Sequence, residues 1–259
     1  MTTVTAPAGA LLDPARPSLV RLTAVELRKM VDTRSGRWLL ILIALAAVAM
    51  MPVVLFAVPE REQTLREFFT ASQAGVFFLL PVLGIMSVTS EWSQRTALTT
   101  FTLVPDRNRV VMAKVLGGAA LGTAFIAVGL VVSVLAKALG EVVGRSDGSW
   151  SLPLSVVGTG LLLSLTTVLM GVAFAMLCMN TPIAIVLYFL LPTLWTTLGE
   201  MVEKLNSVAG WLDTNRTLAK LSEPGITSGE WARVGTSLLV WMVIPLVAGV
   251  IRLNRREVK

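Results

Sequence analysis

Long apolar stretches without a single charged residue constrain this sequence more than any other feature. Five of them occur, over residues 38–59, 70–90, 115–136, 148–199 and 234–251. A charged side chain at the middle of a bilayer costs about 2.5 to 3.5 kcal/mol, and a helix needs about 20 apolar residues to cross the hydrocarbon core. Each stretch is therefore predicted to span a membrane at least once.

The fourth stretch is more than twice as long as one crossing requires. Asn180, Thr181 and Pro182 lie near its middle, and asparagine followed by proline at a helix start is a turn signal. The stretch is thus predicted to be a helical hairpin, with spans over residues 151–179 and 182–199. The expected fold class is all-α integral membrane, with six transmembrane helices.

The composition excludes several function classes. Hydrophobic residues make up 54% of the chain and charged residues only 15%, which is too apolar for a soluble domain. Histidine is absent and Cys178 is the only cysteine, so the usual zinc and haem ligands are missing and no internal disulfide can form. No metal or other cofactor is expected on this chain. A net charge of +6 could suggest a nucleic-acid partner in a soluble protein, but in a membrane protein the basic residues must first be assigned to one side of the membrane or the other. No nucleic-acid partner is expected.

Basic residues concentrate next to the first and last spans, and this concentration predicts the orientation. They are Arg28, Lys29, Arg34 and Arg37 before the first span, and Arg252, Arg255, Arg256 and Lys259 after the last. Because cytoplasmic segments carry the excess of Lys and Arg, both termini of this multi-pass protein are expected in the cytoplasm, with the chain in the cell membrane. The first apolar run is too long for a cleaved signal peptide, so it is expected to stay as an anchor.

The N-terminal segment divides into a tail and a helix. Residues 1–17 have too little apolar content to pack and are predicted to be a disordered cytoplasmic tail. From Leu19 to Arg34, apolar residues recur at helical spacing, apart from most of the charged ones. This stripe consists of Val20, Ala24, Leu27 and Val31. An interfacial helix whose basic residues contact lipid phosphates is expected here, and a merely solvated helix is the alternative.

The connection over residues 90–114 is longer than a turn requires. It keeps three apolar residues among polar ones, namely Leu98, Phe101 and Leu103. A short helix from near Trp92, ended by Pro105, is expected, and Asp106 is a candidate cap for the helix that follows. Either a partner docks on this connection or it is a surface hairpin without one.

The segment from Glu200 to Arg233 is the longest non-spanning piece that is expected outside the cell. Apolar residues at i, i+4, i+7 and i+11 predict one amphipathic helix through Met201, Leu205, Val208 and Leu212. Residues 223–225, Glu-Pro-Gly, are expected to break it. Thr227 and Glu230 have the spacing of a capping box, which predicts that the last helix begins near Ser228.

The sequence contains few residues that could couple transport to a proton gradient, bind ATP or catalyse a reaction. No Asp, Glu, Lys or Arg lies within the predicted spans, which disfavours proton coupling, and Lys137 at the outer edge of the third span is expected to snorkel. The sequence lacks a G-x-x-x-x-G-K-S/T phosphate loop, so a partner would have to bind ATP. The intramembrane serines lack a base, so this chain is not expected to be an enzyme.

Threonines give the fourth and fifth spans a mildly polar character and are a possible solute path. They are Thr166, Thr167, Thr193, Thr196 and Thr197. Helix packing is the alternative, because threonine hydroxyls also bond back to helix carbonyls.

Two local patterns resemble those of the ABC-2-type transporter permeases, and the resemblance covers nearly all of the chain from the interfacial helix to the last span. The first pattern is an amphipathic elbow helix with Glu26-Leu27-Arg28-Lys29, followed by residues 33–37 before the first span. The second is similar to the coupling segment that those permeases place between their second and third spans. It consists of Ser90-Glu91 and Arg95-Thr96, then Pro105, Arg107, Arg109 and Lys114.

The resemblance implies the permease half of an ATP-driven exporter. The expected partners are two cytosolic ABC ATPase subunits, which hold the ATP and Mg, a second permease copy in a homodimer or heterodimer, and membrane lipid. It also implies an elbow-helix role for Glu26, Arg28 and Lys29. The residues expected to couple to the ATPase are Glu91, Arg95, Thr96, Leu98, Phe101, Pro105, Arg107 and Arg109. A small amphiphilic, drug-like or lipid-like solute is expected, and a scaffold or sensor subunit without transport is the rival hypothesis.

Overall fold

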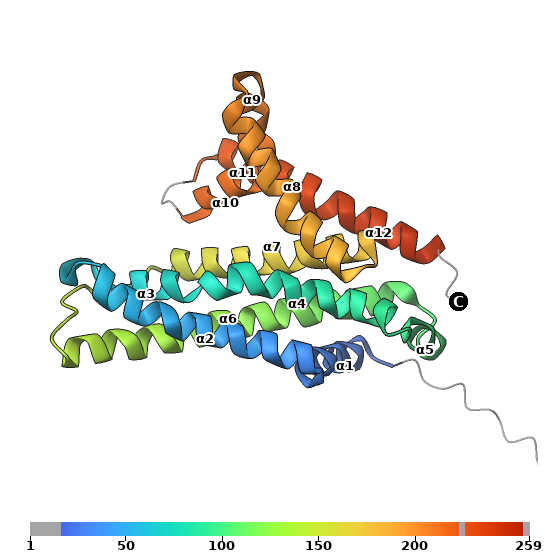
Figure 1. Cartoon of the computed structure of the whole chain (residues 1–259), viewed down its shortest axis with the longest axis horizontal. Helices are drawn as coiled ribbons and strands as arrows, with labels where there is room; N and C mark the ends of the chain where they lie inside the picture. The colour runs from blue at the N-terminus through green and yellow to red at the C-terminus, as the bar shows by residue number, and fades with distance from the viewer. Residues whose placement is uncertain (1–16, 223–225, 256–259) are drawn as a thin grey trace, which may run out of the picture.

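The computed structural model describes residues 17–222 and 226–255, and over these residues the fold is entirely helical (Figure 1). Six helical segments within them are long and apolar enough to cross a membrane. They are Arg34–Ala57, Leu65–Ser93, Arg107–Val142, Leu154–Cys178, Thr181–Met201 and Ser228–Arg255. The predicted all-α membrane fold with six spanning helices is therefore confirmed. The predicted tail, residues 1–17, lies outside the described residues except for Pro17.

The elbow consists of α1 (Leu19–Asp32) and the start of α2 (Arg34–Ala57). Thr33 between them has extended backbone, with φ −69° and ψ 141°, and its hydroxyl accepts a hydrogen bond from the N–H of Gly36. A Cβ on Gly36 would overlap the carbonyl oxygen of Met30. The absence of a side chain at Gly36 thus lets the start of α2 lie close to the end of α1. The chain therefore breaks between α1 and α2 instead of forming one long helix.

The two sides of α1 have different surroundings. Val20 is 79% exposed and Val31 is 43% exposed, so two members of the predicted apolar stripe face away from the bundle. Glu26 and Met30 are instead buried, because α1 packs against α6 (Arg107–Val142). The stripe is thus divided, because Val20 and Val31 are exposed whereas Leu27 lies against Gly117 of α6, and the carboxylate of Glu26 is buried.

The core of the bundle lies where α4 (Ala74–Ser93) packs on α7 (Leu154–Cys178), with α6 and α12 (Ile244–Arg255) also against α7. Short α3 (Leu65–Ser72) precedes α4, and Gln73 joins the two. A Cβ on Gly171 of α7 would overlap the carbonyl oxygen of Pro81 of α4. Small residues at this crossing let the two backbones approach, which is how membrane helices associate without a hydrophobic driving force.

The predicted hairpin divides after α7. Met179 has φ 51°, a left-handed conformation that ends α7, and the side chain of Asn180 accepts a hydrogen bond from the N–H of Ile183 at the start of α8 (Thr181–Met201). From this point α8 leaves the body of the bundle. Figure 1 shows α8 diverging from the helices around α7. α11 (Ser228–Leu238) also lies away from them, whereas α12 returns to pack on α7.

The described part of the long segment between the fifth and sixth spans forms two short α-helices and a turn of 3₁₀-helix, Lys220–Ser222, and not one helix. Asp213 separates α9 (Glu203–Leu212) from α10 (Thr214–Ala219), because its carboxylate accepts hydrogen bonds from the N–H groups of Asn215 and Arg216. The prediction of one amphipathic helix through Met201, Leu205, Val208 and Leu212 is thus wrong in two respects. Met201 ends α8, so α9 contains only the last three of these residues, and a further helix follows Asp213. The predicted break at residues 223–225 lies outside the described residues, and the capping box of Thr227 and Glu230 is confirmed.

The predicted helix between the second and third spans is shorter than expected. The start near Trp92 is wrong, because α4 continues to Ser93 and Arg95 then takes a left-handed conformation with φ 57°. Only α5 (Ala97–Leu103) forms a separate helix. As predicted, Asp106 caps the next helix, α6, by accepting a hydrogen bond from the N–H of Arg109.

Candidate functional site: a buried charge cluster beneath α5

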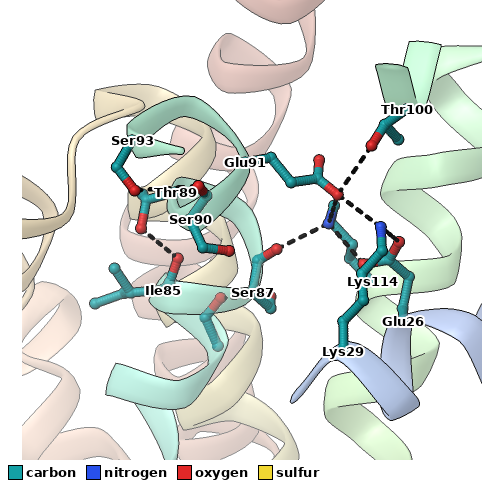
Figure 2. Close-up of polar contacts among 11 residues, drawn as sticks. Glu26, Lys29, Ile85, Ser87, Thr89, Ser90, Glu91, Ser93, Thr100 and Lys114 are labelled. Atoms are coloured by element: carbon teal, nitrogen blue, oxygen red, sulfur yellow. Dashed lines mark hydrogen bonds and ion pairs between the residues drawn. The ribbon is translucent and has the colours of Figure 1, made fainter. Parts of the chain in front are cut away.

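Four charged side chains meet at the end of the bundle where α5 lies (Figure 2). Glu26 and Lys29 come from α1, Glu91 from the end of α4, and Lys114 from α6. We call these four residues the charge cluster. It joins three helices that are far apart in the sequence.

The two amines of the charge cluster bridge its two carboxylates. Lys114 Nζ lies 2.6 Å from Glu26 Oε2 and 3.0 Å from Glu91 Oε1. Lys29 Nζ lies 2.7 Å from Glu26 Oε1 and 2.8 Å from Glu91 Oε1. Lys114 also donates to the carbonyl oxygen of Ser87 at 2.8 Å. The four charges sum to zero, and each carboxylate contacts both amines.

Three members of the charge cluster are withdrawn from solvent: Glu26 is 5% exposed, Glu91 6% and Lys114 3%. Burial disfavours the ammonium form of Lys29, but the carboxylates of Glu91 and Glu26 outweigh this effect and raise its pKa. Removing one member would leave an unbalanced buried charge, which typically costs about 3 to 5 kcal/mol. The arrangement is suited to holding helices together, because every charge is already neutralised by neighbours.

α5 is attached to the charge cluster and to the core on its inner side. Thr100 of α5 donates to Glu91 Oε1 at 3.4 Å, as Figure 2 shows. The ring of Phe101 packs on Trp92 with 6.4 Å between centroids, and the guanidinium of Arg107 lies 5.1 Å from the centre of the same ring. Arg107 also donates to the carbonyl oxygen of Leu253 in α12. α5 thus contacts α4 and α6 directly, and Glu91 and Arg107 in turn contact α1 and α12.

The outer side of α5 is uncovered in the single chain, and its exposed side chains are two leucines together with Thr99 and Thr102. Leu98 is 50% exposed and Leu103 is 75% exposed. Phe101, which the sequence grouped with these two, packs inward against the core instead. The surface that remains for a partner therefore contains Leu98 and Leu103 but not Phe101.

The other predicted coupling residues lie around α5 in different settings. Arg95 is exposed at the turn before α5, and Thr96 precedes the helix without making a side-chain cap. Pro105 is exposed after the helix, and Arg109 donates to the carbonyl oxygen of Pro17 at 2.6 Å.

Of the predicted elbow residues, Glu26 and Lys29 join the charge cluster. Arg28 instead pairs with Asp32 on the surface, at 3.2 Å.

Sequence reasoning missed the burial of Lys114. Lys114 immediately precedes the third apolar stretch, so it was placed outside the span. In the structure α6 begins at Arg107, seven residues before Lys114, so Lys114 lies within the helix. Lys137 at the other end of α6 is likewise wholly buried, and it does not reach out of the bundle by snorkelling. Its amine donates to Glu141, at 2.9 Å, and to the carbonyl oxygen of Ser146, at 3.2 Å. A basic residue at the edge of an apolar stretch is the only signal in the sequence for either site.

The predicted solute-path threonines are not gathered in one place. Thr167 and Thr193 line a cavity of about 440 Å³ between α4, α7, α8 and α10. Thr196 donates to Asp213 at 3.0 Å and so fastens α8 to the cap of α10. Thr197 is exposed and donates back to the carbonyl oxygen of Thr193, while Thr166 is buried within the bundle. Two of the five thus line a cavity.

Within residues 17–222 and 226–255, no group of three or more Cys, Asp or Glu side chains is placed to hold a metal ion. No family model matches this chain, and no curated protein sequence matches it. The six spanning helices and the geometry around α5 are therefore the features of this chain that indicate a function.

Proposed function

We propose that this chain is the permease subunit of an ATP-driven ABC exporter, which moves a small amphiphilic, drug-like or lipid-like solute out of the cytoplasm across the cell membrane. The observation that carries the proposal is the attachment of α5. On its outer side Leu98 and Leu103 are exposed. On its inner side Thr100 donates a hydrogen bond to Glu91, and Phe101 packs against the hydrophobic core. A displacement of α5 by a docked partner would therefore reach the spanning helices.

The partners in this proposal are two cytosolic ABC ATPase subunits and a second permease copy, identical or different. The ATPase binds ATP and Mg, and this chain is not itself an enzyme. The excess of basic residues near both termini supports a cytoplasmic position for the termini and hence for α5. An exposed apolar surface at that position is expected to be covered by protein, because water and not lipid surrounds it.

Cross-linking tests the docking surface. In a Cys178→Ser background, cysteines at Leu98 and Leu103 should each be captured by an ATPase subunit in the active complex. Ala97 lies on the same helix but is only 3% exposed, so Ala97→Cys is the matched control and should not be captured. Consistent failure at both leucines in active complex would contradict docking on α5.

Reconstitution tests transport. Vesicles that contain this chain and its ATPase should move solute with ATP alone, should continue when the proton gradient is collapsed, and should stop when the catalytic glutamate of the ATPase is replaced. Stable ATPase binding without movement of any amphiphile would favour the scaffold or sensor hypothesis. Movement driven by an ion gradient through this chain alone would overturn the proposal.

A further inference from the structure

The cavity between α4, α7, α8 and α10 is suited to a neutral molecule. Its volume is about 440 Å³, within the range of about 300 to 1,000 Å³ that is usual for small-molecule sites. No Asp, Glu, Lys or Arg is among the described residues that line it. A charged group placed there would lose its hydration without meeting an opposite charge, which is strongly unfavourable. The cavity therefore selects against ions.

Aromatic rings from two helices form much of the cavity wall. Phe77 and Phe78 come from α4, and Tyr188 and Phe189 come from α8. The rings of Tyr188 and Phe189 meet edge to face, with 4.8 Å between their centroids. Because aromatic rings also prefer stacked or edge-to-face contacts with a bound ring, this wall favours an aromatic ligand over a flexible hydrocarbon chain.

Two hydroxyl groups in the wall of the cavity have no hydrogen-bond partner within the described part of the chain. They belong to Tyr188, which is 8% exposed, and Thr214, which is 4% exposed. Neither oxygen is one of the fully enclosed atoms without a partner, so each hydroxyl keeps some accessible surface. By contrast, Thr167 and Thr193 donate to carbonyl oxygens of their own helices, at 3.0 and 2.7 Å. A mostly buried hydroxyl without a partner is uncommon in proteins, and a ligand in the cavity can supply the partner.

Tyr188 and Thr214 lie at different levels along α8. Thr196 of α8 donates to the carboxylate of Asp213 at 3.0 Å, which holds the neighbouring Thr214 beside this part of the helix. Tyr188 precedes Thr196 by eight positions, which corresponds to roughly 12 Å along the helix axis. One elongated ligand can therefore contact both hydroxyls, one near each of its ends.

We propose that this cavity binds an elongated, neutral, mainly aromatic molecule with an uncharged polar group at each end. One polar group accepts a hydrogen bond from Tyr188, and the other accepts one from Thr214. The aromatic part packs on the phenylalanines of α4 and α8. Binding needs no ATPase. The inference rests on the proposed function only for the further claim that this molecule is the exported solute.

Three stilbenes that differ only in their end groups test the class of ligand. The probe is trans-para,para′-dihydroxystilbene, a rigid neutral molecule of comparable length. The comparisons are trans-stilbene, which has no hydroxyls, and the corresponding para,para′-dicarboxylate, which has a charge at each end. Binding to the purified full chain in nanodiscs is measured at neutral pH, and the signal of protein-free nanodiscs is subtracted.

Dihydroxystilbene should bind saturably, and the dicarboxylate should bind about a hundredfold more weakly or not at all, because no cation lines the cavity. Equal affinity of the dicarboxylate would overturn the assignment of a neutral ligand. Absence of saturable binding of dihydroxystilbene would overturn the cavity as a site for this class.

Conservative substitutions test each hydroxyl. Tyr188→Phe keeps the ring and its contact with Phe189, and Thr214→Val keeps the shape of the side chain. Each change should weaken binding of dihydroxystilbene about fivefold, as expected for one hydrogen bond, and should leave binding of stilbene unchanged. Unchanged affinity for dihydroxystilbene in both folded variants would overturn the hydroxyls as ligand contacts.

A bulky side chain on α8 tests the location of the site. Thr193→Trp fills the cavity and should weaken binding of both dihydroxystilbene and stilbene about tenfold or more. Thr197→Trp is the matched control, because Thr197 lies one turn further on α8, is exposed and does not line the cavity. Both variants should keep the unfolding temperature of the parent. Unchanged binding in folded Thr193→Trp would overturn the cavity as the site.

A transport assay with the ATPase separates this inference from the proposed function. ATP-dependent movement of dihydroxystilbene that Thr193→Trp abolishes would support both. Saturable binding that Thr193→Trp abolishes, without ATP-driven movement of any solute, would retain the site and count against the proposed function. Absent binding of dihydroxystilbene together with ATP-driven movement of another solute would overturn the site and leave the proposed function standing.

Discussion

Lys114 and Glu26 lie 88 positions apart in the sequence, yet the amine of the first is 2.6 Å from a carboxylate oxygen of the second. The contact fastens α1 to α6 inside the protein. Glu91 contacts the same amine at 3.0 Å, so the end of α4 is held at the same point. The helix that was expected to lie on the membrane surface is thus attached to two spanning helices by buried charge.

Replacing Lys114 with Met should lower the free energy of unfolding by about 3 to 5 kcal/mol, because two carboxylates then share one partly exposed amine. The double variant Glu26→Gln/Lys114→Met should be more stable than Lys114→Met alone, since Lys29 and Glu91 remain as a balanced pair. Thermal unfolding in mild detergent measures both. Arg28→Gln is the control: Arg28 is a surface partner of Asp32, and its loss should change stability by less than about 1 kcal/mol. A large effect of Arg28→Gln would contradict this ranking.

Phe101 and Leu103 of α5 should separate stability from coupling. Phe101→Asp should uncouple transport from ATP hydrolysis. Because the ring of Phe101 packs on Trp92 and near Arg107, this variant should also reduce thermal stability. Leu103→Asp should leave stability nearly unchanged, because Leu103 is 75% exposed, and should lower ATP-driven transport. Unfolding temperature and transport are measured on the same preparations. Normal transport by stable Leu103→Asp would argue against α5 as the coupling element.

Gly171 and Gly158 of α7 should respond differently to the same substitution. Gly171→Ala should destabilise by about 1 to 3 kcal/mol, because its methyl group would overlap the carbonyl oxygen of Pro81. Gly158 has nothing within 4 Å of a built Cβ, so Gly158→Ala should be neutral or slightly stabilising. Unfolding in detergent compares the two. Equal losses would show that close packing of α4 on α7 is not the cause.

The contribution of Lys29 should depend on pH in one direction only. Its pKa is raised in the folded protein by Glu91 and Glu26, so its stabilisation is fully present below its ordinary pKa and is lost as pH rises through the higher, folded-state value. The stability difference between wild type and Lys29→Met should therefore stay constant from neutral to mildly alkaline pH and shrink only at strongly alkaline pH. A difference that shrinks toward acidic pH before the carboxylates titrate would contradict this sign.

The spanning helices and the hairpin between α7 and α8 could be predicted because their signals are local. Apolar stretches must satisfy their backbone groups as helices in lipid, and Asn180 with Pro182 ends one helix and begins the next without help from distant residues. The cap of α6 at Asp106 and the capping box at Thr227 are equally local. By contrast, the start of α5 was misplaced, because Trp92 continues α4 and its ring contacts Phe101 across the turn.

The number of spans could be predicted from the amino-acid sequence alone, since transfer of each segment into lipid depends mainly on that segment's own side chains. Which charges are buried and which threonines line a cavity is set instead by the packing of the helices on one another. Lys114 and Arg109 both belong to the first turns of α6, yet the first meets Glu26 and the second meets Pro17. The physical reason is that burial and ion pairing depend on which helices pack around a side chain, and that packing brings together residues whose separation in sequence carries no signal.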